Sequence, residues 1–242
     1  MPDNDAVQSD DYDTANPRWY LATRLRDVLL HRWSAEIQAI GVHGSMAHGD
    51  DTDGSDVNVV VVTYRSGAGP RPVLRRVDGT LVGLTVITGD EGLRQARELT
   101  PRWPLVADRY VTTRDLFDPR GWFAKQRDVH LGRLAETRPG EFSALARHNW
   151  CVASGAHARA VRLAEWYDTD TAMVLMADAR LHTAMVAGLL SRTYFRNRAD
   201  AVRRTGLAGA DITELGATLT AQAEDLTARG RPVDGRLAAL FE

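Results

Sequence analysis

The residues best suited to chemistry lie in one short stretch of the chain. It begins with two small residues, Gly44 and Ser45, whose lack of side-chain bulk lets backbone N–H groups approach a phosphate closely. Asp56 and Asn58 follow, and residues two apart on a strand point to the same face. An acid pair in that position would hold a divalent cation against a triphosphate, as two-metal phosphoryl chemistry requires. Asp56 supplies one carboxylate, and Asn58 offers an amide oxygen in place of the second.

Short strands and one helix are expected to position these residues. A helical apolar stripe predicts a helix over 18–33, and the segment 43–54 is rich in turn residues. The valine run that follows Asn58 indicates a strand buried on both faces. Asp78-Gly79 between two β-rich runs predicts a hairpin. The expected strands cover 37–42, 57–63, 72–77, 80–88 and 110–112.

Near residue 130 the sequence pattern changes from β-rich runs that alternate with helical stretches to a pattern that predicts helix throughout. Its apolar spacing is that of a packed bundle. We therefore expect a disordered lead-in over 1–17, a mixed α/β domain over 18–128 and an all-α helical domain over 129–242. The expected helices are 89–99, 141–166, 171–193, 199–206 and 211–230, with a short C-terminal piece.

Composition narrows the classes of partner. With 44% apolar and 26% charged residues and a formal charge of −2, the chain has the profile of a globular protein and no long-range attraction for nucleic acid or membranes. Cys151 is the only cysteine, so no disulfide or thiolate zinc site forms within one chain, and its neighbours suggest a buried thiol. No apolar run approaches the roughly 20 residues that span a bilayer, and the N-terminus is unlike a secretion signal. A cytoplasmic location is expected.

The Gly-Ser turn followed by Ser55-Asp56 at the start of a buried strand resembles the signature of the nucleotidyltransferase superfamily that includes DNA polymerase beta. In order and spacing, the chain from about residue 20 looks like kanamycin nucleotidyltransferase. That resemblance implies that Gly44, Ser45 and Ser55 bind the nucleotide and that Asp56 ligates the metal. It also implies a helical domain that helps to form an antibiotic pocket, and pairing of two chains into a homodimer.

The chain departs from that family pattern at three places. Asn58 replaces the second acid, which removes a negative charge from a site for a hard cation. The second hairpin strand, 80–88, contains no acid, so the third carboxylate is missing. The helix that should carry the general base has no carboxylate between Glu141 and Glu165, which leaves His148 or His157 as candidates.

Several further residues have weaker claims to a role. A loop of acids before Asp56 offers charge to a displaced cation, although turn chemistry favours such residues anyway. Scattered cations can meet phosphates, and an arginine-rich segment with two aromatic residues can line a pocket, but both are more simply explained as solvated surface. The acid pair that opens the helix at 89–99 is explained by favourable charge at a helix N-terminus. These residues are Asp50, Asp51, Asp53, Arg75, Arg76, Lys125, Asp90, Glu91 and the segment Arg192 to Arg204 with Tyr194 and Phe195.

Three functions follow as hypotheses. The first is transfer of a nucleoside monophosphate from an NTP, with Mg²⁺, to a hydroxyl of an aminoglycoside-like small molecule. Asp56 and Asn58 would hold the metal, and a histidine such as His148 would act as base. The second is a repurposed biosynthetic enzyme that uses the same fold without metal or nucleotide. The third is a non-catalytic binding protein.

Overall fold

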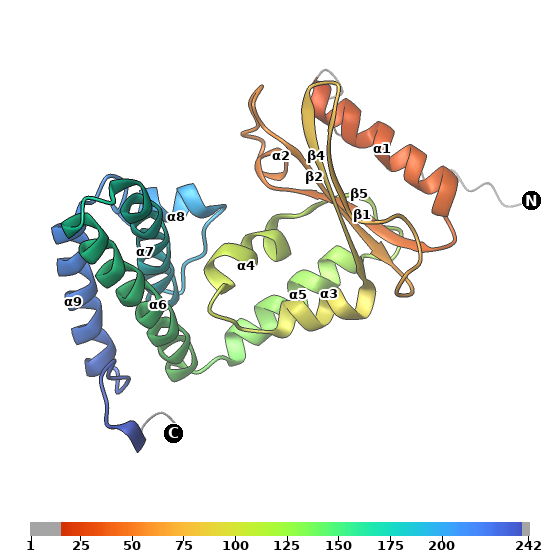
Figure 1. The fold of residues 1–242 in the computed structure, drawn as a ribbon. Helices are drawn as coiled ribbons and strands as arrows, with labels where there is room; N and C mark the ends of the chain where they lie inside the picture. Colours follow the sequence, from red (N-terminus) through yellow and green to blue (C-terminus); the bar gives the residue numbers. More distant parts are fainter. Residues whose placement is uncertain (1–15, 239–242) are drawn as a thin grey trace, which may run out of the picture. The chain divides into compact units, whose positions relative to one another are not determined.

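The computed structural model describes residues 16–238. These residues divide into two compact units (Figure 1): unit 1 contains residues 16–93 and 112–126, and unit 2 contains residues 94–111 and 127–238. Unit 2 thus takes in a segment that we had assigned to the sheet domain. The expected disordered lead-in lies outside the described residues, except for Asn16 and Pro17, which begin the first helix.

Unit 1 is built on a mixed five-stranded sheet in the order β3-β4-β2-β1-β5. β2 and β4 are parallel, whereas the β1–β2, β1–β5 and β3–β4 pairs are antiparallel. The mixed sheet expected from the sequence is therefore present. The strands are β1 (Ile37–His43), β2 (Val57–Thr63), β3 (Val73–Val77), β4 (Thr80–Thr88) and β5 (Arg114–Phe117).

The central strand β2 is buried on both faces, as its valine run predicts. Val57, Val59 and Val61 pack in the core that α1 (Pro17–Trp33) covers (Figure 1). Val62 points to the other face and packs against Trp122, at the start of α5 (Trp122–Glu136). β2 is therefore fixed by packing on both of its faces, and this packing also fixes the positions of the residues at its ends.

The hairpin expected at Asp78-Gly79 is present. Val77 of β3 pairs with Thr80 of β4, so the turn has two residues. Asp78 and Gly79 have φ of 48° and 79°, the positive values that a type I′ turn requires.

The strand expected at residues 110–112 is wrong. These residues end α4 (Trp103–Thr112), and the last strand is β5, two residues later. The β-rich composition of Tyr-Val-Thr suggested a strand, but the buried positions Trp103, Ala107 and Tyr110 repeat at four and three residues, which is helical. Tertiary packing of that face decides the structure against local propensity.

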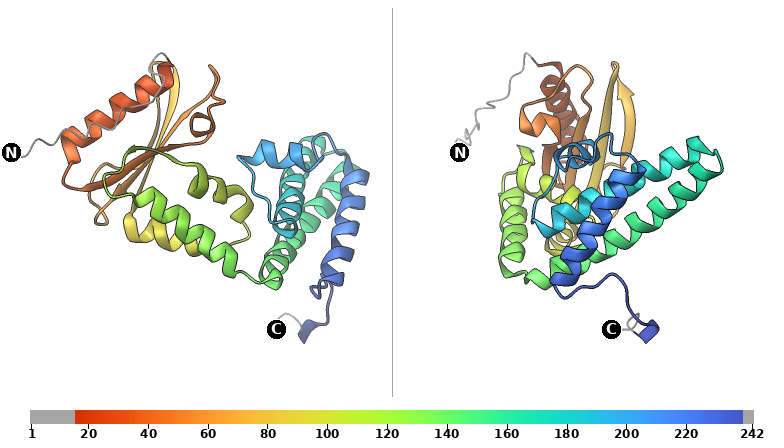
Figure 2. Two further views of the ribbon diagram at one scale, coloured as in Figure 1. Left: turned by 180° about the vertical axis from the view of Figure 1, so that it is seen from behind. Right: turned by 90° about the vertical axis from the view of Figure 1, so that its left-hand side faces the viewer.

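Unit 2 is helical. α6 (Pro139–Glu165) and α7 (Thr169–Leu190) run side by side, as Figure 2 shows, and small buried residues at Ala153, Ala156 and Ala160 allow their close approach. α8 (Arg198–Arg204) and α9 (Ile212–Ala228) complete the bundle, and α3 (Gly89–Arg97) begins in unit 1 and ends in unit 2.

Two expectations about unit 2 need correction. Cys151 is exposed, because the buried positions of α6 on either side of it, Asn149 and Ala153, define a face that it does not share. α7 has 22 residues, and an 18-residue window within it has a mean hydropathy of 1.3, so by length and composition alone it could cross a membrane. A core helix passes the same test, and Ala179, Ala184 and Leu189 of α7 are fully buried in the bundle.

Candidate functional site

The sheet brings Asn58 against the Gly-Ser turn. In the antiparallel register of β1 and β2, Asn58 lies opposite His43, the residue just before Gly44. A Cβ added at Gly44 would lie 3.6 Å from Asn58 Nδ2. The side chain of Asn58 therefore faces the turn, as the strand spacing predicts.

The turn itself requires glycine. Gly44 has φ 79° and ψ −150°, a conformation that residues with a side chain rarely adopt. Ser45 then begins α2 (Ser45–His48), a single helical turn that the sequence analysis had treated as irregular. Met46 in this turn is fully buried in the core beneath α1, and Gly49 ends the helix in the left-handed region. The turn is thus fixed to the core by one side chain.

β4 approaches Asn58 from the other side. Gly83 is the parallel partner of Asn58, and a Cβ added there would lie only 2.9 Å from Asn58 Oδ1. Gly83 therefore provides the space that the Asn58 amide occupies. At this position of β4 a carboxylate side chain could serve as a further metal ligand, but the residue here is Gly83.

Asp56 lies immediately before β2 and is half-buried. No hydrogen bond or ion pair within residues 16–238 uses the side chains of Ser45, Asp56 or Asn58. Most polar side chains of folded proteins that are removed from water find a partner within the chain. Three half-buried polar side chains without one, around a glycine turn, leave their oxygen atoms available to a ligand.

The neighbouring acids serve to anchor the loop. Asp51 accepts a hydrogen bond of 2.8 Å from Asn16 Nδ2, and Asp53 lies 3.7 Å from the guanidinium of Arg18. These contacts tie the loop to the N-terminus of α1. Asp50 is exposed.

Ser55 also stabilises this loop. Its hydroxyl accepts a hydrogen bond of 2.9 Å from the backbone N–H of Thr52, and its carbonyl accepts one of 3.0 Å from Arg18 Nε. Because Arg18 is buried, this link connects α1 to the residue before Asp56. The structure thus gives Ser55 a role in holding Asp56, in addition to the nucleotide contact that the resemblance implies.

Residues suited to a metal are few. Among residues 16–238 no group of three or more His, Cys, Asp or Glu side chains is arranged to hold a metal ion. A cation beside Asp56 and Asn58 would have one carboxylate, one amide oxygen and whatever oxygens a ligand brings. Mg²⁺ commonly binds through one or two carboxylates together with substrate phosphates and water, so the residues present fit Mg²⁺ only as part of a magnesium–phosphate complex.

The expected cations remain at the surface. Arg75 and Arg76 lie on β3, every residue of which is exposed, and Arg76 donates a hydrogen bond of 2.7 Å to the carbonyl of Gly79 in the hairpin turn. Lys125 is exposed on α5. Asp90 and Glu91 occupy the first turn of α3, where they complement the helix dipole.

The two candidate bases lie in unit 2 and differ in their surroundings. His148 is exposed on α6. His157 lies nine residues further along α6, on its opposite side. Its Nε2 is 2.7 Å from the carbonyl oxygen of Ile212 in α9, so that nitrogen is used in a contact between two helices of the bundle.

Sequence reasoning missed a third histidine, His182 on α7. Its Nδ1 lies 2.9 Å from Asn149 Oδ1, and Asn149, fully buried on α6, donates from Nδ2 to the carbonyl of Pro101 at 2.7 Å. Burial lowers the pKa of His182, Asp178 opposes that effect, and His148 with other positive charge adds to it. The sequence gives one indication of this pair: Asp178 and His182 are four residues apart, the spacing at which two side chains on a helix meet.

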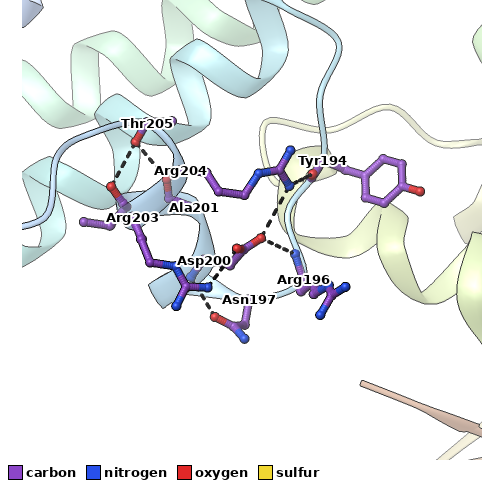
Figure 3. Close-up of polar contacts among 9 residues, drawn as sticks. Tyr194, Arg196, Asn197, Asp200, Ala201, Arg203, Arg204 and Thr205 are labelled. Carbon is purple, nitrogen blue, oxygen red and sulfur yellow. Dashed lines mark hydrogen bonds and ion pairs between the residues drawn. The ribbon is translucent and has the colours of Figure 1, made fainter. Parts of the chain in front are cut away.

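The arginine-rich segment folds around one buried acid. Asp200 accepts hydrogen bonds from the backbone N–H of Arg196 at 3.2 Å and from Arg203 and Arg204 at 3.2 and 3.5 Å (Figure 3). Burial alone would raise the pKa of Asp200, but these donors outweigh it and the pKa is lowered. Phe195 is buried in the bundle core. The segment therefore fixes α8, although part of α8 also borders a pocket described below.

Among known proteins, the chain shows similarity only to solved structures. No protein-family model matches the chain, and no curated protein matches it. Among solved structures, the chain is similar to a nucleotidyltransferase-like protein from Exiguobacterium sibiricum 255-15, with a TM-score of 0.44, 14% sequence identity, and coverage of 83% of this chain and 75% of that one. A similarity this low carries no argument about activity or substrate, so the function must be inferred from the site itself.

Proposed function

We propose that unit 1 binds the phosphates of a nucleoside triphosphate together with Mg²⁺, and that the protein transfers the nucleoside monophosphate to a hydroxyl of a small molecule. The observation that carries the proposal is the position of Asn58, opposite the end of β1 and against the Gly44 turn. That position, with Asp56 two residues earlier, gathers backbone N–H groups and metal-binding oxygens at one end of the sheet.

Each residue has a role in this proposal. The turn at Gly44 and Ser45 offers N–H groups and a hydroxyl to phosphate oxygens. Asp56 and Asn58 provide a carboxylate and an amide oxygen to Mg²⁺, which would offset the charge that develops on the transferred phosphoryl group. The chain's own contribution to rate is positioning and electrostatic stabilisation, as in other phosphoryl-transfer sites. An aminoglycoside-like acceptor is what the resemblance in sequence implies.

A second candidate function is binding of a phosphorylated small molecule without catalysis or metal. It is favoured by Gly83, which occupies the strand position beside Asn58 where a carboxylate would strengthen cation binding. Loss of an electrostatic contact to a developing charge typically costs about a hundredfold or more in rate. The two candidates make opposite predictions about magnesium.

The test is a thermal-shift titration with ATP, GTP, CTP and UTP, each with and without Mg²⁺, on the wild type and Asp56→Ala. A ligand at a hundred times its Kd stabilises the native state by about 2.7 kcal/mol, which is a shift of a few degrees for a chain of this size. We expect a magnesium-dependent shift with at least one nucleotide, abolished in Asp56→Ala. Pyrophosphate release is then measured with a panel of hydroxyl acceptors.

The control is Asp90→Ala, which removes an exposed carboxylate in the first turn of α3, beyond the opposite end of β4 from Asp56, and should leave the nucleotide shift intact. A shift that occurs equally without Mg²⁺ and in Asp56→Ala would favour the second candidate. If no nucleotide or sugar phosphate changed the transition, both candidates would be wrong.

A further inference from the structure

Unit 2 contains a pocket that the proposed function does not use. It lies between α7 and α8 and has a volume of about 520 Å³, within the range of small-molecule sites. Its walls are mostly apolar, and three charged side chains complete them. One of these, Arg180, already donates hydrogen bonds to the carbonyl of Ala210, which leaves one acid and one arginine for a ligand. The residues that matter here are Val174, Ala177, Leu181, Val202, Asp178 and Arg198.

The charged residues of this pocket are not paired with each other. Asp178 and Arg198 form no ion pair within 4.0 Å, and the guanidinium of Arg198 takes part in no hydrogen bond with the residues that the structure describes. Its neighbours Arg203 and Arg204 bind Asp200 (Figure 3). Asn197 caps α8 through a hydrogen bond of 2.9 Å from the N–H of Asp200, which fixes the helix that carries Arg198. A cation and an anion are thus held apart on one apolar pocket.

His182 does not line the pocket but lies beside Asp178, which does. Because Asn149 donates to the carbonyl of Pro101 through Nδ2, its Oδ1 must accept, so His182 Nδ1 carries the proton and donates. In the neutral imidazole this leaves Nε2 with a lone pair, 3.7 Å from Asp178 Oδ1. Two acceptors face each other with no hydrogen between them. The carboxylate of Asp178 therefore receives no hydrogen bond from the neutral ring and is available to a donor in the pocket, such as an ammonium group.

We propose that the α7–α8 pocket binds a small organic zwitterion with an apolar body, of the kind an aromatic amino acid represents. Its ammonium group is bound by Asp178, its carboxylate by Arg198, and its body by Val174, Leu181 and Val202. Asp178 and Arg198 are both exposed, so water solvates them in the free protein. A ligand that carries both charges can pair with both side chains, whereas a ligand with one charge pairs with only one, which is why the chemistry points to a zwitterion. This inference is independent of the nucleotide site.

The geometry also makes binding depend on pH. The charged or titratable groups that act on His182 are Asp178 on its own helix, His148 on α6 and Arg198 at the start of α8. Burial, the largest effect, and the two positive groups favour the neutral ring. When the pH falls far enough to protonate His182, Nε2 becomes a donor to Asp178 and competes with the ligand's ammonium group. Affinity for the amine therefore decreases on acidification.

The experiment is isothermal titration calorimetry of the full chain with three probes: L-phenylalanine, phenethylamine, which lacks the carboxylate, and 3-phenylpropionate, which lacks the ammonium group. We expect L-phenylalanine to bind at least tenfold more tightly than either analogue. Asp178→Asn should weaken the binding of phenylalanine and phenethylamine but not that of 3-phenylpropionate. Arg198→Gln should weaken the binding of phenylalanine and 3-phenylpropionate but not that of phenethylamine. His182→Gln should remove the loss of phenethylamine affinity between pH 7.5 and 5.5.

Controls separate this site from misfolding and from unit 1. Asp225→Asn, an exposed acid paired with Arg229 on α9, should bind all three probes like the wild type, and circular dichroism should be unchanged in each variant. Asp56→Ala should retain phenylalanine binding whether or not it retains nucleotide binding. Absence of phenylalanine binding to the wild type at millimolar concentration would overturn the proposal, as would binding to Asp178→Asn and Arg198→Gln as tight as to the wild type.

Discussion

At the residue scale, Asn58 is the most informative side chain in unit 1. It is bordered by two glycines, Gly44 and Gly83, and the contact with each is set by strand register rather than by residues near it in sequence. Asparagine and aspartate have the same shape, so the space around Asn58 admits either. The choice of the amide changes the charge of the site while preserving its form.

We predict that Asn58→Asp strengthens binding of a magnesium nucleotide by about tenfold, equivalent to about 1.4 kcal/mol, because a second carboxylate suits a hard cation better than an amide oxygen. The measurement is nucleotide affinity by calorimetry at fixed nucleotide and varied Mg²⁺. Asn58→Ala is the matched variant and should weaken binding. Equal affinity in Asn58→Asp and the wild type would mean that this side chain does not face a metal.

At the element scale, the strands were predictable because local pattern and tertiary burial agree in them. Val57–Thr63 is apolar and β-branched and lies in the middle of the sheet, and the hairpin at Asp78-Gly79 has the residues that its turn requires. The end of α4 was predicted as a strand because local pattern and tertiary burial disagree there. Tyr110 has strand propensity, but its burial follows the helical pattern of α4. The short helix α2 carries no periodic signal at all.

The same division applies to the sites. Gly44, Ser45 and Asp56 are close in sequence, so their proximity could be predicted, as could the absence of an acid on β4. The link between Asn149 and His182 could not, because it joins residues 33 positions apart on two helices whose register no local pattern defines. The exposure of Cys151 depends on the same register between α6 and its neighbours.

The packing of β1 against the start of α5 leads to a prediction about Gly41. A Cβ added there would lie 2.6 Å from both Phe123 Cζ and Thr113 Cγ2, so Gly41→Ala must displace buried side chains. We expect a loss of stability of about 1–3 kcal/mol, measured by urea unfolding. Gly54→Ala is the control, because a Cβ at Gly54 meets nothing within 4 Å and it should change stability by less than about 0.5 kcal/mol. Similar losses in both variants would refute the packing argument.

At the scale of the whole molecule, we expect the response to acid to depend on two histidines of unit 2 whose pKa is lowered by burial. His130 is fully buried, with Nδ1 2.8 Å from the carbonyl oxygen of Ala96 and Nε2 3.4 Å from Trp103 Nε1. Burial lowers its pKa, although the contact with Ala96 opposes this, and burial also lowers the pKa of His182. Both groups belong to the same compact unit, so we expect their protonation to affect the stability of that unit together.

The direction of the effect follows from proton linkage. In the unfolded chain a histidine titrates near pH 6.5, whereas His130 in the native state binds its proton only at lower pH. Between these two values the unfolded state binds more protons than the native state, so stability decreases as the pH falls. The contribution of each neutral histidine is complete above about pH 6.5 and is lost progressively below it, by at most about 1.4 kcal/mol per pH unit for each group.

We therefore predict that the free energy of unfolding of unit 2 is nearly constant from pH 8 to 7 and decreases from pH 6.5 to 5, measured by urea unfolding with tryptophan fluorescence. His130→Gln will be less stable at every pH, but the decisive quantity is its slope, which should be smaller because one of the two titrating groups is gone. The carboxylates with lowered pKa, Glu141 and Asp200, add to the loss of stability only at more acidic pH. There their protonation removes the hydrogen bonds that stabilise the charged form. A slope between pH 6.5 and 5 that is the same in His130→Gln and the wild type would show that the buried imidazole does not control the acid response.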